Sequence, residues 1–155
     1  MSVIQIKSSS EKNIQSEKPV NFQIKNKNAK IWLADLTYTE QQISSESMPS
    51  AIGGIATYTE YNLELENSIR IFKYPETLNC AFERDGIPQI IGFSNYMWNC
   101  ELSLAFARRI KEVSPETIIV LGGPNFPVSE KEQEKFLRIH PEVDFYVSGE
   151  GELSF

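Results

Sequence analysis

The stretch Thr117-Ile-Ile-Val-Leu-Gly-Gly-Pro-Asn125 decides the fold of this chain. Its apolar, β-branched run does not alternate with polar residues, which is typical of a strand buried on both faces of a parallel sheet. The run ends at Gly122-Gly123, where two residues without Cβ let backbone or a ligand approach closely. Because ligands of open α/β sheets bind at the carboxyl ends of the strands, the stretch predicts a central strand beside a binding site. An ordinary tight turn before Pro124 is the alternative.

Four further strands are expected around this central one, and helices separate them. The expected strands cover residues 30–36, 68–74, 89–94 and 144–148, and the expected helices cover 49–64, 75–84, 100–113 and 129–140. Strands that alternate with helices predict an α/β fold, with right-handed crossovers and helices on both faces of the sheet. We therefore expect a doubly wound, five-stranded parallel sheet of flavodoxin-like (Rossmann-like) order.

The two ends of the chain lead to expectations about domain organisation. Residues 1–28 are rich in Ser, Lys, Asn and Gln, which indicates a polar tail or linker, although residues 20–24 alternate and could add a short edge strand. Residues 29–155 form the predicted domain. The sequence stops at Phe155, where a fifth covering helix should begin. We expect the sheet to lack that last helix, and its bare face to meet another part of a longer protein.

Composition excludes several classes of function. The chain has 155 residues, 41% of them hydrophobic and 23% charged, which suits one globular domain. Six lysines against two glutamates give residues 1–30 a net charge of +4, so the net charge of −6 leaves −10 on the remainder. An acidic body of this kind argues against nucleic acid as a partner.

Location and redox state also follow from composition. The sequence has no apolar run of the ~20 residues that a membrane span needs and no apolar signal segment, so we expect a cytoplasmic protein without a membrane partner. Cys80 and Cys100 are too few for a zinc or iron–sulfur motif, and in the cytoplasm they should stay reduced.

Four strand ends should meet at one rim of the predicted sheet. They are Asp35-Leu36-Thr37, Ser94-Asn95-Tyr96, Gly122-Gly123-Pro124 and Gly149-Glu150-Gly151-Glu152. A receiver domain would need an acidic residue after the third strand and a lysine after the fifth, and neither is present. A P-loop and a dinucleotide-binding glycine motif are also absent. A flavodoxin-type phosphate loop remains the runner-up, supported only by hydroxyl side chains between Thr37 and Ser47.

At these residues the sequence resembles the cobalamin-binding domain found at the amino end of B12-dependent radical SAM enzymes. The resemblance spans residues 29–155. It is carried by Ile90-Ile-Gly-Phe-Ser-Asn-Tyr96, by Ile118-Ile-Val-Leu-Gly-Gly-Pro124 and by His140-Pro-Glu-Val-Asp-Phe-Tyr-Val-Ser-Gly-Glu-Gly-Glu152. The double glycine alone is unspecific, but its combination with the later Gly-Glu-Gly-Glu is much sharper.

The resemblance implies that the nucleotide tail of cobalamin leaves cobalt and enters the rim, where Ser94 would hydrogen-bond the benzimidazole base and the glycines would leave it room. The implied cofactor-binding residues are Asp35, Thr37, Ser94, Asn95, Tyr96, Gly122, Gly123, Pro124, Asn125, Gly149, Glu150 and Gly151. We also expect that Gly123→Val blocks the tail and leaves the fold intact.

The sequence departs from the wider cobalamin-binding pattern at three positions. Thr37 stands where that pattern has the histidine that ligates cobalt, Glu40 replaces a glycine, and Tyr96 replaces a leucine. The one histidine, His140, precedes the fifth expected strand and so belongs at the opposite rim. Cobalamin is therefore expected in a base-off, histidine-off form. The lower face of cobalt would then be occupied by water, have no ligand, or be shielded by one of the side chains Tyr38, Tyr96, Met97 and Trp98.

The resemblance further implies a following barrel domain in the same parent chain. That domain would hold a 4Fe-4S cluster through Cys-x-x-x-Cys-x-x-Cys, cleave S-adenosylmethionine, and in many members methylate an unactivated carbon of a small-molecule or peptide substrate. The cysteine motif does not occur in residues 1–155, so no residue here is expected to be catalytic or to bind a metal. A degenerate module that packs against other domains without cofactor is the competing hypothesis.

Overall fold

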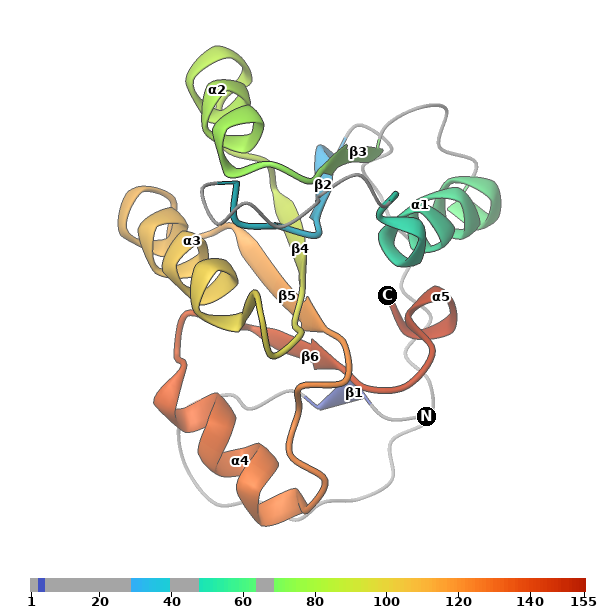
Figure 1. Cartoon of the computed structure of the whole chain (residues 1–155), viewed down its shortest axis with the longest axis vertical. Coiled ribbons are helices and arrows are strands. Elements are labelled where there is room, and N and C mark those ends of the chain that lie inside the picture. Colours follow the sequence, from blue (N-terminus) through green and yellow to red (C-terminus); the bar gives the residue numbers. More distant parts are fainter. Residues whose placement is uncertain (1–2, 5–28, 40–47, 64–68) are drawn as a thin grey trace.

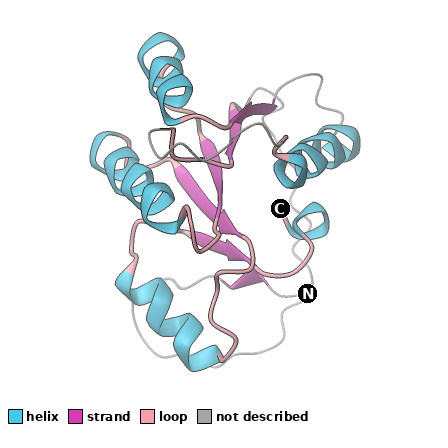
Figure 2. Cartoon of the chain, in the orientation of Figure 1, coloured by secondary structure: helices cyan, strands magenta, loops and turns pink. Residues whose placement is uncertain are grey.

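The computed structural model describes residues 3–4, 29–39, 48–63 and 69–155 of the chain. Within these ranges a twisted sheet lies between two layers of helices (Figures 1 and 2). The strand order is β1-β6-β5-β4-β2-β3. The strands are β1 (Val3–Ile4), β2 (Ile31–Ala34), β3 (Ile69–Phe72), β4 (Ile90–Ser94), β5 (Ile118–Gly122) and β6 (Phe145–Val147).

The five strands β2 to β6 confirm the sequence-based prediction of the fold. Each pairs in parallel with its neighbours, and the first of the five lies between the second and the third, which is the flavodoxin-like order. β1 was not predicted: two residues of the segment expected as tail or linker pair antiparallel with β6. The possible edge strand at residues 20–24 lies outside the described ranges.

The helices divide unequally between the two faces. They are α1 (Ser50–Leu63), α2 (Pro75–Asp85), α3 (Cys100–Val113), α4 (Glu130–Ile139) and α5 (Gly151–Ser154). In Figure 1, α2, α3 and α4 cover one face, while α1 and α5 lie on the other. α5 has only four residues, which agrees with the expectation that the sheet lacks a full last helix. No helix in the described ranges is long and apolar enough to cross a membrane.

The side chains that the strands send to the two faces explain why a cavity forms on only one of them. Alternate residues of each strand point to opposite faces. On the α2–α4 face, large residues such as Trp32, Phe93 and Tyr146 belong to a continuous buried core. On the α1/α5 face, the buried cluster contains only Leu33, Ile52 and Ala56. The face beneath α1 and α5 is therefore incompletely filled.

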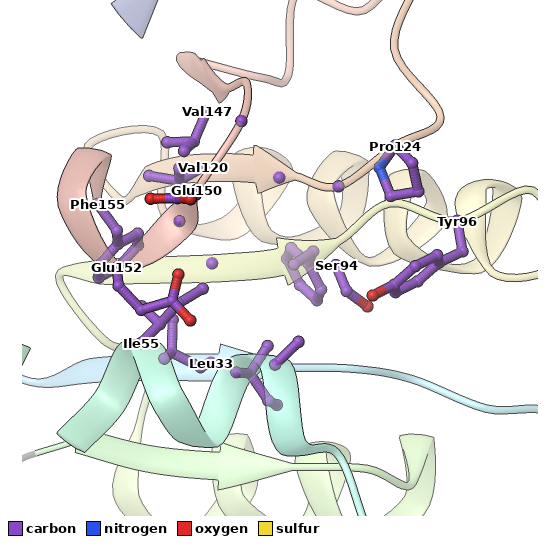
Figure 3. A pocket seen from close by; sticks show the side chains of 18 residues that line it. Leu33, Ile55, Ser94, Tyr96, Val120, Pro124, Val147, Glu150, Glu152 and Phe155 are labelled. Atoms are coloured by element: carbon purple, nitrogen blue, oxygen red, sulfur yellow. The ribbon is translucent and has the colours of Figure 1, made fainter. Parts of the chain in front are cut away.

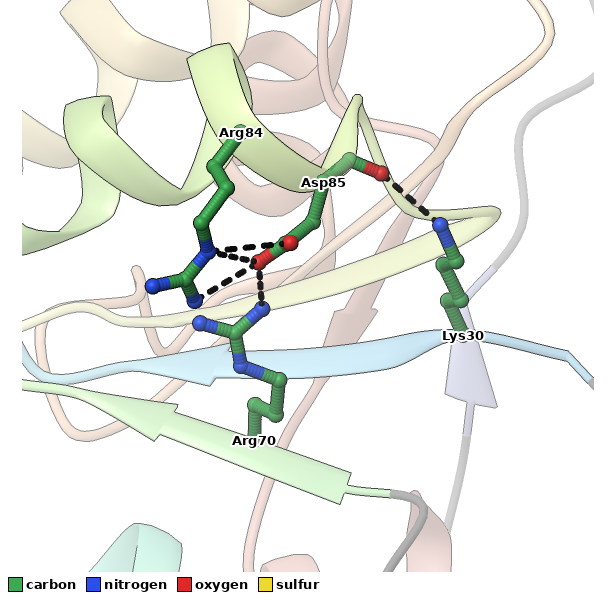
Figure 4. Close-up of polar contacts among 4 residues, drawn as sticks. All are labelled: Lys30, Arg70, Arg84 and Asp85. Atoms are coloured by element: carbon green, nitrogen blue, oxygen red, sulfur yellow. Dashed lines mark hydrogen bonds and ion pairs between the residues drawn. The ribbon is translucent and has the colours of Figure 1, made fainter.

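A charged cluster at the end of α2 ties three elements together (Figure 4). The Asp85 carboxylate accepts hydrogen bonds from Arg84 Nε at 3.0 Å and from Arg70 Nη1, on β3, at 2.6 Å. Lys30 Nζ, just before β2, donates to the Asp85 carbonyl at 2.8 Å. Hydrogen bonds from Arg84 and then Arg70 lower the pKa of Asp85 from 3.8 to about 2. The cluster therefore favours the ionised carboxylate in the folded state.

This cluster predicts a pH-dependent contribution to stability. Because the pKa of Asp85 is lower in the folded than in the unfolded chain, the contribution is complete above about pH 4 and is lost as the pH falls towards 2. We expect Asp85→Asn to lower the urea midpoint at neutral pH, and the difference from wild type to shrink between pH 4 and 2. A difference that is the same at both ends of this range would contradict the assignment.

Candidate functional site

A cavity of about 410 Å³ lies between the sheet and the helices α1 and α5. Its size falls within the range of pockets that bind small molecules and cofactors. In Figure 3, Ser94, Tyr96 and Pro124 lie at one end, and Phe155 and Glu152 lie at the other, beside α5. The lining residues are Leu33, Ala51, Ile52, Ile55, Gly92, Phe93, Ser94, Tyr96, Val120, Gly122, Gly123, Pro124, Val147, Gly149, Glu150, Gly151, Glu152 and Phe155.

Eight of the twelve residues predicted from the sequence line this cavity. They are Ser94, Tyr96, Gly122, Gly123, Pro124, Gly149, Glu150 and Gly151, and they come from the carboxyl ends of β4, β5 and β6, as expected. Asp35, Thr37, Asn95 and Asn125 are not among its lining residues.

Sequence reasoning missed the deeper part of the cavity. Gly92, Val120 and Val147 lie two residues before Ser94, Gly122 and Gly149 respectively, and all of them line the cavity. The sequence contained a signal for these three residues, because residues two apart on a strand point to the same face of the sheet. The cavity therefore continues from the rim along the α1/α5 face of the sheet.

Gly92 is closely covered by two side chains in the deeper part of the cavity. A Cβ at this position would lie 2.7 Å from Leu33 Cδ2 and 3.1 Å from the Phe155 ring. No larger residue fits there unless these neighbours move. The Phe155 ring thus packs over bare backbone in the middle of β4.

The adjacent glycines Gly122 and Gly123 have different roles. A Cβ on Gly122 would make only ordinary contacts, at 3.7 and 3.8 Å, with Val147. Gly123 has φ +130°, and a Cβ there would lie 2.7 Å from the backbone oxygen of Asn95. The expectation that Gly123→Val leaves the fold intact is therefore wrong, because both the backbone conformation and the space require glycine. Gly122 is the position where a side chain can enter the cavity.

Asn95 and Asn125 belong to a buried hydrogen-bond network. Asn95 Nδ2 donates to the Tyr146 hydroxyl at 3.0 Å and to the Asn125 carbonyl at 3.1 Å. The Tyr146 hydroxyl in turn donates to the Gly123 carbonyl at 2.8 Å. Burial raises the pKa of Tyr146, so the phenol keeps its proton and remains a donor. The network fixes the β5–α4 loop against β4 and β6.

Removing one hydroxyl tests this network. In Tyr146→Phe the Gly123 carbonyl loses its donor and Asn95 loses an acceptor, in a region where Tyr146 is fully buried. We expect a loss of about 1–3 kcal/mol in the free energy of unfolding, measured by urea denaturation. Tyr61→Phe, at a tyrosine that is 83% exposed, is the control and should leave that free energy nearly unchanged. Equal effects of the two substitutions would contradict a structural role for the Tyr146 hydroxyl.

Asp35 lies behind Ser94 rather than in the cavity. The Ser94 hydroxyl donates to Asp35 Oδ1, and the side-chain amide of Asn99 donates to both Ser94 Oγ, at 2.9 Å, and Asp35 Oδ1, at 3.2 Å. Asn99 occupies the N-cap position of α3. Its side chain makes no capping hydrogen bond there, because it is engaged with Asp35, Ser94 and the Tyr96 backbone. Asn99 is a further residue whose place in the site sequence reasoning missed.

The aromatic residues of the β4–α3 loop lie at the rim and not in the core. Tyr96 and Trp98 stack with their ring centroids 4.5 Å apart, and Trp98 is 63% exposed. Met97 is 85% exposed.

Thr37 follows β2 and lies beside the end of β3, where its backbone N–H donates to the Lys73 carbonyl at 3.1 Å. Glu40 lies outside the described residues.

The site contains carboxylates but no cluster of metal ligands. Within the described ranges, no three His, Cys, Asp or Glu residues lie together in a way that could hold a metal ion. His140 follows α4, at the amino end of β6, and its Nδ1 lies 3.4 Å from Glu142 Oε1. The protein's one histidine is therefore remote from the rim.

Comparisons with known proteins agree with part of the resemblance seen in the sequence. No protein-family model matches the chain. It is 31% identical over 112 residues to the cobalamin-dependent radical SAM methyltransferase TokK of Streptomyces tokunonensis, an alignment that covers 70% of this chain and 16% of TokK. It is 40% identical over 68 residues to the 2-(S-pantetheinyl)-carbapenam-3-carboxylate methyltransferase of Streptantibioticus cattleyicolor, covering 44% of this chain and 10% of that enzyme. The chain thus spans less than a fifth of the length of these two relatives, and over that part it is similar to two methyltransferases, of which TokK is a cobalamin-dependent radical SAM enzyme.

Proposed function

We propose that this chain binds cobalamin in a base-off, histidine-off form and serves as the carrier domain of a radical SAM enzyme. The parent enzyme is proposed to be a methyltransferase that acts on an unactivated carbon of a small-molecule or peptide substrate. The observation that carries the proposal is the glycine-lined cavity, which opens at the carboxyl rim of a flavodoxin-like sheet. Similarity to TokK over 70% of the chain supports the choice of cofactor.

The lining residues suit a flat, largely apolar group. Gly122 and Gly149 expose backbone where side chains would otherwise fill the space, and Leu33 and Val120 supply apolar walls. Ser94 offers a hydroxyl at the rim end of the cavity. These residues would hold the nucleotide tail, and Tyr96 and Pro124 would flank its entrance.

Cobalt would receive no histidine from this domain. Thr37 occupies the position at which the wider pattern has histidine, and His140 lies at the other end of the sheet. When bound, cobalamin would supply a cobalt centre that carries a methyl group. The stacked Tyr96–Trp98 pair and exposed Met97 are the apolar side chains from which we propose a shield for its lower face.

The radical step would belong to another part of the parent protein. Cys80 and Cys100 are the two cysteines of the sequence, and they do not form the three-cysteine motif of a radical SAM cluster. We propose that a following domain holds the 4Fe-4S cluster and S-adenosylmethionine, and that the protein works in the cytoplasm, where both thiols stay reduced.

A module without cofactor is the second candidate function. The Phe155 ring favours it, because this ring already occupies the space over Gly92 at the inner end of the cavity. Such a module would keep the sheet for packing against other domains. The two candidates differ in whether the folded chain takes up a corrinoid.

Reconstitution with hydroxocobalamin, followed by gel filtration, separates these candidates. We expect one corrinoid to co-elute with the protein and its visible absorbance to be that of the base-off form, because neither benzimidazole nor histidine reaches cobalt. A folded chain that elutes without corrinoid would favour the module without cofactor. The absorbance of nitrogen-ligated cobalt would show that Thr37 had been wrongly interpreted.

A further inference from the structure

Ser94 ends β4 and contributes a side-chain hydroxyl to the rim end of the cavity. The hydrogen bonds that this hydroxyl already makes determine whether it can donate to a ligand or accept from one. It donates to Asp35 Oδ1 and accepts from Asn99 Nδ2 at 2.9 Å. A hydroxyl has a single proton, so this proton points to Asp35, a residue that does not line the cavity.

The orientation of the Asn99 amide confirms this direction. The backbone N–H of Tyr96 donates to Asn99 Oδ1 at 2.8 Å, and a backbone N–H can only donate. The Nδ2 group must therefore face Ser94 and Asp35, as its distances to both show. Asn99 is fully buried, which keeps this arrangement away from water.

Ser94 has one hydrogen-bonding capacity left. A serine hydroxyl has one proton and two lone pairs, and the proton and one lone pair are already used by Asp35 and Asn99. The remaining lone pair can only accept. An unprotonated ring nitrogen could form no hydrogen bond with this lone pair, because both atoms would be acceptors. A protonated ring nitrogen could donate its N–H to Ser94.

The charges around the cavity favour the same kind of group. Among the described residues that line it, the charged side chains are Glu150 and Glu152, both from the β6–α5 segment. The lining residues of α1 are apolar, and those at the β4 and β5 ends are uncharged or glycine. Asp35 adds a third carboxylate behind Ser94, at the end of β2. Glu150 and Glu152 lie towards the α5 end of the cavity, whereas Asp35 contacts Ser94 and is the carboxylate that can favour a cation beside it.

Resting on the proposed function, we propose that Ser94 accepts a hydrogen bond from the protonated ring nitrogen of the displaced benzimidazole, and that the Asp35 carboxylate behind Ser94 favours this cationic form. The site would then select the protonated base by both hydrogen-bond polarity and charge. Uptake of cobalamin by the chain would consume a proton from solvent.

Proton uptake measured by calorimetry tests this inference. Titration of the full chain with methylcobalamin, in buffers of different ionisation enthalpy at about pH 6, gives the number of protons taken up on binding. Methylcobinamide, which has the same ring without the nucleotide tail, is the reference. We expect about one more proton for methylcobalamin than for methylcobinamide.

Three variants locate the proton. Asp35→Ala frees the Ser94 proton to point into the cavity, so the extra uptake should fall close to zero while methylcobalamin still binds. Ser94→Ala should weaken methylcobalamin by roughly tenfold and leave methylcobinamide unchanged. The Glu150→Gln, Glu152→Gln double variant should still show extra uptake, because the proton resides on the base.

The outcomes separate this inference from the function on which it rests. Binding of methylcobalamin to wild type without extra proton uptake would overturn the inference and leave cobalamin binding intact. Loss of the extra uptake in the double glutamine variant would place the proton on Glu150 or Glu152 and also overturn it. A folded chain that binds neither corrinoid would overturn both.

Discussion

Gly122→Val is expected to reduce cobalamin binding by roughly ten- to a hundredfold while the protein stays folded. A Cβ at Gly122 meets only Val147, at ordinary contact distances, so the backbone tolerates a side chain. The two methyl groups would project into the cavity that is proposed to receive the nucleotide tail. Binding should be measured from the visible absorbance of the bound corrinoid, and folding from circular dichroism.

The same substitution at Gly53 is the matched control for Gly122→Val. Gly53 lies in α1, does not line the cavity, and has nothing within 4 Å of the position of a Cβ. Gly53→Val should therefore bind cobalamin as wild type does. If folded Gly122→Val also bound cobalamin normally, the nucleotide tail could not lie in this cavity.

Gly123→Ala is expected to have the opposite effect, a large loss of stability. Its φ of +130° is unfavourable for any residue with a Cβ, and that atom would lie 2.7 Å from the Asn95 backbone oxygen. Backbone strain and overpacking each cost about 1–3 kcal/mol, so we expect the free energy of unfolding to fall by about 3 kcal/mol or more. Urea denaturation measures this loss.

Gly53→Ala again provides the comparison. In the middle of a helix, alanine is favoured over glycine by about 1 kcal/mol, so this variant should be as stable as wild type or more stable. Similar stabilities of Gly123→Ala and Gly53→Ala would show that the Gly123 backbone can relax. In that case the different roles assigned to Gly122 and Gly123 would be wrong.

The sheet could be predicted from the sequence because each strand carries its own signal. The uninterrupted apolar run at residues 118–121 and the apolar or alternating stretches before and after it indicate strands, and the helices between these strands predict a parallel sheet with right-handed crossovers. Val3–Ile4 has no comparable signal. Two residues are too few for a recognisable alternation, and their pairing with β6 depends on the tertiary structure.

The candidate site could be predicted only at its rim. Glycines and polar residues at strand ends are visible in sequence, which is how Ser94, Gly122 and Gly149 were found. Gly92 lies inside an apolar run, and its importance appears only when Leu33 and Phe155 are seen beside it. Asn99 fits a helix-cap pattern equally well, since sequence does not reveal that Asp35 and Ser94 lie within reach of its amide.

The central claim is that the cavity beneath α1 and α5 receives the nucleotide tail of cobalamin. Comparing the affinities of the wild-type chain for cobalamin and for cobinamide, which lacks that tail, tests it most directly. We predict that cobalamin binds roughly a hundredfold more tightly, from the apolar surface buried in the cavity, and that Gly122→Val removes most of this advantage. Equal affinity of the wild-type chain for the two corrinoids would contradict the account.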